Sequence, residues 1–130
     1  MKIVIGYPPN IDAIRKVFTL SGGEIFCYGD IIYNPAGGLL SPALIKHEEV
    51  HEKQQGDEVE DWWDRYLVDE TFRFQQELPA HVAEYRELIR PFKDRNHRAH
   101  ILGFVAGKLS ADLYGNVCTK AEAISLIRKG

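Results

Sequence analysis

Residues 47–51 read His-Glu-Glu-Val-His, and this spacing can place three chemically active side chains around one metal ion. On an α-helix, residues at positions i and i+4 lie on one face, so His47 and His51 can point their imidazoles at the same metal. Glu48 leaves the helix about 100° around from His47, where its carboxylate can take a proton from metal-bound water. The pattern therefore indicates a metal centre with its own general base.

A helix must carry these residues, and the flanking sequence predicts one over about 42–55. Ser41 can accept a hydrogen bond from a free backbone N–H at the start of the helix, and Pro42 suits the first helical position. Gly56 is suited to the end of the helix. The face of the two histidines also carries Leu44, Gln54 and Gln55. The charged residues that face outward or lie on the flanks include Lys46, Glu49 and Lys53. The histidines are therefore expected to face the protein body.

Short strand and helix patterns precede the motif helix. Residues 2–7 are mainly β-branched and apolar and predict a strand, and residues 10–19 carry apolar side chains at helical spacing. Two further runs, 24–28 and 30–33, predict a hairpin or a bulged pair of strands. The second of these runs comes just before the motif helix. It can either expose an edge that pairs with an extended peptide or simply form part of the sheet.

The rest of the sequence predicts a mainly helical structure. Residues 57–74 mix acidic and aromatic side chains and are expected to form one or two helices. Helices are also predicted over 77–90 and over about 98–113, with a break at 114–116. A capping box that begins at Thr119 starts the last helix. The expected fold class is therefore α+β, mostly helical, with a small N-terminal β-sheet and a metal-binding helix.

The composition narrows the class of protein. A chain of 130 residues is long enough for one domain and too short for two, so residues 1–130 are expected to form a single domain. A net charge of −3 gives no electrostatic basis for nucleic-acid binding. The first residues lack the apolar length of a secretory signal, and no stretch approaches the length of a membrane span. We therefore expect a cytoplasmic protein without membrane contacts, in which Cys27 and Cys118 are reduced thiols.

A catalytic zinc site commonly has three protein ligands and one water, so the two histidines need a further partner. One segment offers three candidates for this third ligand: Glu77, His81 and Glu84. Pro79 lies among them and lacks a backbone N–H, so the helix in this segment is expected to start or kink at this residue. That placement would leave Glu77 just outside the first turn and give Glu84 more weight as an alternative ligand.

An H-E-x-x-H motif followed by a helix with E-x-x-A resembles the gluzincin branch of zinc metallopeptidases. Glu77-Leu78-Pro79-Ala80 matches the second motif. The resemblance implies that Glu77 is the third zinc ligand and that the small Ala80 lets the two helices approach each other. The chain length resembles the minimal gluzincins, which implies one small zincin-like domain over residues 1–130. Residues 47–55 are also similar to a His-Glu-x-x-His-x-x-Gln-Gln run in small phage-encoded hypothetical proteins. The resemblance covers about residues 35–90.

Motif and resemblance together lead us to expect a zinc-dependent metallopeptidase that acts on a peptide or protein substrate. Zinc-activated water would attack the peptide bond, with Glu48 as general base. A hydrogen-bond donor must also stabilise the oxyanion, and four side chains are candidates: Tyr85, Tyr114, His97 and His100. The alternatives are a non-catalytic zincin-like binding module and a phage structural or interaction protein. Glu48 favours the enzyme, because a purely structural zinc site needs no base at that position.

Overall fold

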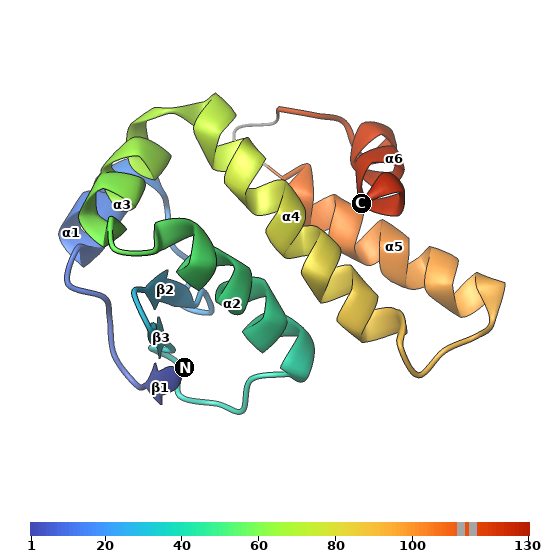
Figure 1. Cartoon of the computed structure of the whole chain (residues 1–130), viewed down its shortest axis with the longest axis horizontal. Coiled ribbons are helices and arrows are strands. Elements are labelled where there is room, and N and C mark those ends of the chain that lie inside the picture. Colours follow the sequence, from blue (N-terminus) through green and yellow to red (C-terminus); the bar gives the residue numbers. More distant parts are fainter. Residues whose placement is uncertain (112–113, 115–116) are drawn as a thin grey trace.

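The computed structural model describes residues 1–111, 114 and 117–130. Within these residues the chain forms three short strands near the N-terminus and six helices (Figure 1). The strands are β1 (Lys2–Val4), β2 (Phe26–Tyr28) and β3 (Ile31–Tyr33). The helices are α1 (Ile11–Val17), α2 (Pro42–Gln55), α3 (Val59–Val68), α4 (Glu70–Ile89), α5 (Arg95–Leu109) and α6 (Lys120–Lys129). The predicted α+β class, mostly helical with a small N-terminal sheet, is confirmed.

The three strands form one sheet in the order β1-β3-β2. β1 is parallel to β3, with Ile3 opposite Ile32, and β2 is antiparallel to β3, with Cys27 opposite Ile32. Gly29 permits the tight connection between β2 and β3, because its φ of 63° lies in the left-handed region that glycine tolerates. β3 is paired on both sides. The strand before the motif helix is therefore part of the sheet and has no free edge for a peptide.

α2 is the predicted motif helix and has the predicted bounds. Oγ of Ser41 accepts a hydrogen bond from the backbone N–H of Leu44 at 3.2 Å, and Pro42 lies in the first turn. Gly56 ends the helix with a φ of 51°. These local signals define both ends of the helix and so help to set the direction in which its histidines point.

Gln55, the last residue of α2, fastens this helix to the β2–β3 hairpin. Its Oε1 accepts a hydrogen bond from the backbone N–H of Gly29 at 2.8 Å. Its Nε2 donates to the backbone carbonyl of Cys27, also at 2.8 Å. Because Gln55 is only 1% exposed, water does not compete for these bonds. The small sheet thus fixes the C-terminal end of the motif helix.

α4 differs from the sequence-based expectation. It begins at Glu70, where Oδ1 of Asp69 accepts a hydrogen bond from the backbone N–H of Phe72 at 3.0 Å, and it continues through Pro79. We expected the helix to start or kink at Pro79, and the expected start is wrong. The proline removes one backbone hydrogen bond, but the packing of α4 against α2 and α5 outweighs that loss. Glu77 consequently lies in the middle of a long helix.

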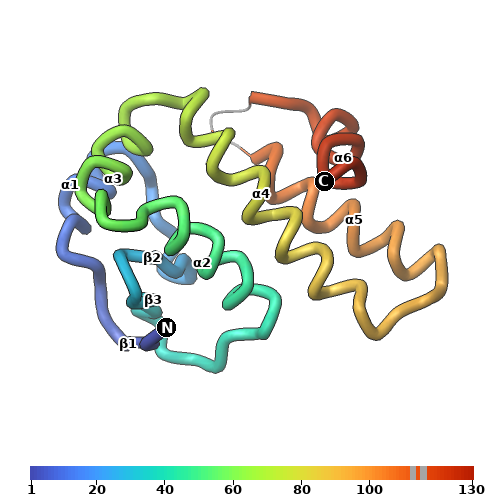
Figure 2. The backbone as a smooth tube through the Cα atoms, viewed as in Figure 1, coloured from blue at the N-terminus to red at the C-terminus, as the bar shows by residue number. Residues whose placement is uncertain are grey.

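Two hydrophobic clusters hold α2 and α4 in place. The first joins α4, α5 and α6, and its buried members include Val82, Leu102, Val105, Leu109 and Ile127. The second lies among α1, α3 and the sheet, and its buried members include Ile14, Phe26, Trp62, Trp63 and Tyr66. α2 and α4 lie side by side between these clusters (Figure 1 and Figure 2). The motif residues therefore lie where the two clusters meet.

The last two helices are present, but the bounds of the first differ from the prediction. The helix expected over about 98–113 begins earlier and ends earlier, at Arg95–Leu109. Residues 112–113, and residues 115–116 of the predicted break at 114–116, lie outside the described residues. The capping box predicted at Thr119 is present, with reciprocal hydrogen bonds of 3.1 and 3.0 Å between Thr119 and Glu122. None of the described helices is both long and apolar enough to cross a membrane.

Ala80 provides a test of the close contact between α2 and α4. Its side chain is fully buried and lies on the face of α4 that carries Glu77 and Glu84, both of which reach α2. Ala80→Leu should force the helices apart and lower the free energy of unfolding by about 2 kcal/mol or more. Ala99→Leu, at an exposed position of α5, should change it by less than about 0.5 kcal/mol. Urea denaturation of both variants measures the difference, and equal stabilities would contradict the close contact.

Candidate metal centre

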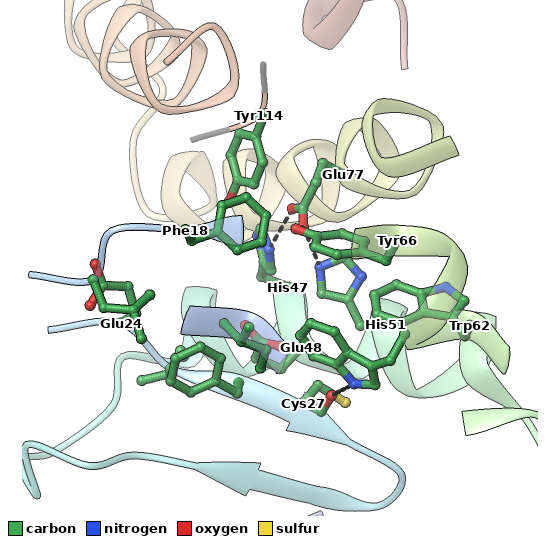
Figure 3. Close-up of a pocket in the computed structure, with 15 residues that line it drawn as sticks. Phe18, Glu24, Cys27, His47, Glu48, His51, Trp62, Tyr66, Glu77 and Tyr114 are labelled. Carbon is green, nitrogen blue, oxygen red and sulfur yellow. Dashed lines mark hydrogen bonds and ion pairs between the residues drawn. The ribbon is translucent and has the colours of Figure 1, made fainter. Parts of the chain in front are cut away.

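His47 and His51 of α2 meet Glu77 of α4 in the interior of the protein (Figure 3). Nε2 of His47 lies 3.2 Å from Oε1 of Glu77, and Nε2 of His51 lies 3.2 Å from Oε2 of the same carboxylate. The three residues are 6%, 4% and 3% exposed. The structure therefore brings together the two histidines of the motif and the glutamate that the resemblance indicated.

This group of three side chains could hold a metal ion. One ligand atom from each side chain lies within 4.8 Å of the other two, which suits ligands that each bind one ion at about 2 Å. Oε1 of Glu77 is buried and has no hydrogen-bond partner among the described residues. Burying a carboxylate oxygen without a donor is costly, and a cation at this position would remove the cost.

A second potential group of ligands shares one histidine with the first. Ligand atoms of His47, His81 and Glu84 also lie within 4.8 Å of one another. Nζ of Lys108 forms an ion pair with Glu84, so a cation in this group would compete with the ammonium for the charge of that carboxylate. The group that contains Glu77 is therefore the stronger candidate.

The remaining ring nitrogen of His47 has a partner of its own. Nδ1 of His47 lies 2.9 Å from Oε1 of Glu84, and Lys108 of α5 donates a hydrogen bond to the other oxygen of that carboxylate. In metal centres, such carboxylate contacts orient a histidine ligand and fix which ring nitrogen carries the proton. Glu84, one of the three sequence candidates for the third ligand, thus lies on the side of His47 away from Glu77.

His51 and Glu77 also have outer partners. Nδ1 of His51 lies 2.8 Å from Oε1 of Gln54, whose Nε2 donates to the backbone carbonyl of Gln76 at 2.9 Å. A proton on Nδ1 satisfies this bond and leaves Nε2 free to bind a cation. The hydroxyl of Tyr66 in α3 donates to Oε2 of Glu77 at 2.6 Å. Every side chain of the candidate centre is therefore oriented by a neighbour.

Opposite charges across the contact between α2 and α4 shift the pKa values of these groups. Burial alone would lower the pKa of His47, but its contacts with the carboxylates of Glu77 and Glu84 outweigh it and raise this pKa to about 10. The pKa of His51 is also raised, because the charge of Glu77 outweighs burial. Burial would raise the pKa of Glu84, yet His47 and Lys108 hold it at about 2. Without a metal ion, protonated histidines supply the positive charge that the buried carboxylates need.

Glu48, the expected general base, lies beside the two histidines on α2 and is 6% exposed. Burial raises the pKa of its carboxyl, and the positive charges of His47 and His51 oppose the shift. A raised pKa suits a carboxylate that must both accept and release a proton near neutral pH. Glu49 is placed differently, on the other side of the helix, where it lies 3.9 Å from the ammonium of Lys46.

Two cavities adjoin His47 and Glu48, and Tyr114 lines both. The smaller has a volume of about 80 Å³ and is enclosed largely by apolar side chains, among them Ile14, Phe18, Leu20 and Phe26. The larger has a volume of about 510 Å³ and is lined by parts of the 34–40 loop together with Glu84 and Lys108. The candidate centre therefore borders both an apolar pocket and a wider groove.

Tyr114 is the oxyanion-donor candidate that the structure brings to this centre. Its ring meets that of His81 edge-on at 5.4 Å, and in the view of Figure 3 it is drawn above His47 and to the left of Glu77. Burial and the charge of Glu77 raise the pKa of its hydroxyl well above the usual value, so the group stays protonated and can donate a hydrogen bond. The other three candidates lie elsewhere. Tyr85 packs in the cluster of α4, α5 and α6, and the remaining two are exposed on α5: His97 and His100.

His81, the remaining candidate for the third ligand, is fully buried beside Glu77. Its Nδ1 lies 2.7 Å from the backbone carbonyl of Glu77, and its ring meets that of His47 edge-on at 4.8 Å. Burial lowers its pKa to about 4, so the ring is neutral. Its Nε2 has no hydrogen-bond partner among the described residues. The structure thus places His81 behind the centre, in contact with the first histidine.

Sequence reasoning missed the outer partners of the centre. Gln54 had one signal, its position on the histidine face of the motif helix. Tyr66 and Lys108 belong to α3 and α5, and no spacing in the sequence connects them with the motif. They are found only when the tertiary packing of these helices is known.

Comparisons with protein-family models, with curated proteins and with solved structures found no match to this chain. The resemblance to gluzincins therefore rests on the residues of the two motifs. What the site can do must accordingly be argued from its own geometry and charge.

The raised pKa of His47 predicts how the stability of the metal-free protein depends on pH. Its value of about 10 in the folded protein exceeds the value of about 6.5 for an unperturbed histidine. The stabilisation is therefore fully present below about pH 6.5 and is lost as the pH rises through 10. One pKa unit corresponds to about 1.4 kcal/mol, so we expect the free energy of unfolding to fall by at least about 2 kcal/mol between about pH 6.5 and 9.

The control for this measurement is a histidine outside the centre. His47→Gln should reduce the fall in stability, whereas His97→Gln, which changes an exposed residue, should preserve it. Urea titrations of chelator-treated protein at several pH values measure the effect. A free energy of unfolding that stays constant or rises from pH 6.5 to 9 would contradict the charges assigned to the centre.

Proposed function

We propose that this protein is a zinc-dependent metallopeptidase whose metal ligands are His47, His51 and Glu77. The observation that carries the proposal is the convergence of these three buried side chains on one point, with Glu48 beside them and two cavities that adjoin His47 and Glu48. Two imidazole nitrogens and one carboxylate oxygen form a donor set typical of catalytic zinc, which keeps a fourth position for water.

The buried charges of the site also suit a divalent cation. Three carboxylates are buried near the contact between α2 and α4: Glu48, Glu77 and Glu84. Lys108 contributes one positive charge to this group. A divalent ion bound by neutral histidines would make the whole group neutral. Neutrality matters because an uncompensated charge in the protein interior costs several kcal/mol.

Each residue of the site has a distinct part in the proposed reaction. A zinc ion bound here would supply a water of lowered pKa and a Lewis acid for the peptide carbonyl. Glu48 would accept a proton at its carboxylate and later deliver it to the leaving amine. Tyr114 would donate a hydrogen bond to the carbonyl oxygen as negative charge develops there. The wide groove would admit the peptide, and the apolar pocket would receive one of its side chains and exclude water.

The alternative is a non-catalytic zincin-like binding module. A purely structural zinc site is closed by four protein ligands. Among the described residues, the group at Glu77 contains three potential ligands, and the carboxylate of Glu48 lies next to it. An incomplete ligand set with an adjacent base favours the enzyme, and neither feature is expected of a phage structural protein.

Metal stoichiometry is the first requirement of the proposal. We expect one zinc per chain after reconstitution and dialysis. His47→Ala should retain less than about a tenth of an equivalent, because it removes one of three ligands from a site that binds metal only when folded. His97→Ala, the exposed control, should retain the full equivalent. Plasma emission spectrometry measures all three proteins, and a wild type with less than about a tenth of an equivalent would refute zinc binding.

Zinc affinity can distinguish Glu77, the proposed third ligand, from Glu84, which lies on the other side of His47. Glu77 faces Nε2 of both histidines, whereas Glu84 contacts only Nδ1 of His47. Glu84→Ala should weaken zinc affinity by about 10- to 100-fold, as expected for an outer partner of a ligand. Glu77→Ala should weaken it further. Competition titrations with a chromogenic chelator rank the two variants, and the reverse order would move the site to the group of His47, His81 and Glu84.

The role of Glu48 can be tested against its neighbour. Glu48→Gln should keep the fold and the zinc but lose at least about a hundredfold in hydrolysis, the scale usual for a general base. Glu49→Gln should change hydrolysis little, because Glu49 pairs with Lys46 away from the centre. Cleavage of a peptide library, followed by mass spectrometry, measures the rates, with the zinc content checked for each variant.

Two results of the library experiment would change the conclusion. If the wild type cleaves peptides and Glu48→Gln cleaves them equally fast, the mechanism assigned to Glu48 is wrong. If the fully zinc-loaded wild type cleaves no member of a broad library, the binding module replaces the peptidase as the best-supported function.

A further inference from the structure

The two carboxylate oxygens of Glu77 lie in different surroundings. Oε2 accepts a hydrogen bond of 2.6 Å from the hydroxyl of Tyr66. Each oxygen also lies 3.2 Å from Nε2 of a motif histidine, Oε1 from that of His47 and Oε2 from that of His51, but Oε1 has no hydrogen-bond donor among the described residues. Tyr66 is 6% exposed and Glu77 is 3% exposed, so bulk water does not even out this difference. One oxygen therefore already has a donor, and the other is available to a cation.

Tyr66 is held firmly in this position. Its ring stacks on that of Trp62 with centroids 4.8 Å apart and an interplanar angle of 21°, and it meets the ring of Trp63 edge-on at 5.2 Å. Arg73 fixes the backbone, because its Nε donates to the carbonyl of Tyr66 at 2.9 Å and its Nη2 to that of Leu67 at 3.0 Å. With ring and backbone both anchored, the hydroxyl stays directed at Glu77 (Figure 3).

The chemistry of the two groups and their geometry set the direction of the hydrogen bond. A phenol hydroxyl has a proton to donate, whereas the oxygens of an ionised carboxylate can only accept. The hydroxyl of Tyr66 therefore donates to Oε2 of Glu77 across 2.6 Å. This bond takes up one of the lone pairs of Oε2, so Oε2 is the weaker metal ligand of the two oxygens.

We propose that Tyr66 is a positioning residue that makes Glu77 bind zinc through Oε1 alone. This inference rests on the proposed zinc function. A carboxylate that bound through both oxygens would take up the position that catalytic zinc keeps for water and substrate. Tyr66 therefore keeps the centre open, although it touches neither the metal nor the substrate.

Cobalt(II) bound in place of zinc reports the number of ligands, because four-coordinate cobalt absorbs visible light more strongly than five-coordinate cobalt. We expect the wild type to bind one cobalt per chain with the strong absorption of a four-coordinate ion. Tyr66→Phe should lower the absorption per bound cobalt about twofold or more, as Oε2 joins the centre and a fifth ligand is added. It should also weaken zinc affinity by about tenfold, the loss typical of an outer partner. Tyr85→Phe, a half-buried tyrosine in the cluster of α4, α5 and α6, should change neither quantity.

The outcomes separate this inference from the zinc proposal. An unchanged cobalt spectrum in Tyr66→Phe overturns the role of Tyr66, and so does a weak spectrum of five- or six-coordinate cobalt in the wild type. If Tyr66→Phe fails to fold, as judged by circular dichroism, the hydroxyl acts on the fold and not on the ligand, and the inference fails. If the wild type binds neither cobalt nor zinc, the proposed metal centre itself fails.

Discussion

The structure depends on one buried contact, in which the histidines of α2 face the carboxylates of α4. His47 lies between Glu77 and Glu84, with one ring nitrogen directed at each, and His51 shares Glu77. Ionised side chains this deeply buried are stable only when opposite charges and hydrogen bonds surround them. Two histidines that carry protons, or a metal ion in their place, satisfy that condition. The pairing of α2 with α4 therefore presents the same side chains to a proton or to a metal ion.

The rest of the chain supports this contact from both sides. The cluster of α4, α5 and α6 brings Lys108 to Glu84, and the cluster of α1, α3 and the sheet brings Tyr66 to Glu77. Gln55 ties the end of α2 to the hairpin. Each hydrophobic cluster thus contributes a hydrogen-bond partner to one of the buried carboxylates at the junction. Outer partners of this kind decide how precisely metal ligands are oriented, so the fold and the proposed chemistry cannot be separated.

Local signals in the sequence predicted the elements whose ends are determined by their own residues. Ser41, Pro42 and Gly56 defined α2, and the capping box at Thr119 defined the start of α6, because caps act within a single turn. The histidine spacing also predicted which side of α2 faces inward. The start of α4 was not predicted correctly. Pro79 removes a backbone hydrogen bond and so argues locally against a helix that continues through it. The packing of α4 against α2 and α5 outweighs this loss, but packing between helices is not visible in the sequence of one helix.

In the candidate site, too, signals within one helix could be read from the sequence, and contacts between helices could not. The spacing of His47, Glu48 and His51 was readable because all three lie on one helix. The choice among Glu77, His81 and Glu84 depended on the relative position of two helices. In the structure, Glu77 faces Nε2 of His47 and Glu84 faces Nδ1 of the same ring. His81 packs edge-on against that ring. Tyr66 and Lys108 come from further helices. Their part in the centre follows from packing between distant segments, for which a single sequence contains no periodic signal.

Zinc K-edge X-ray absorption of the reconstituted protein tests the central claim most directly. If His47, His51 and Glu77 form the centre, the spectrum will show only nitrogen and oxygen donors at about 2.0–2.1 Å, with the scattering pattern of two imidazole rings. Sulfur at about 2.3 Å would contradict the assignment, because it would require a cysteine ligand such as Cys27, which lines the apolar pocket. A shell of oxygen atoms without imidazole scattering would equally contradict it, because the zinc would then be bound elsewhere on the protein.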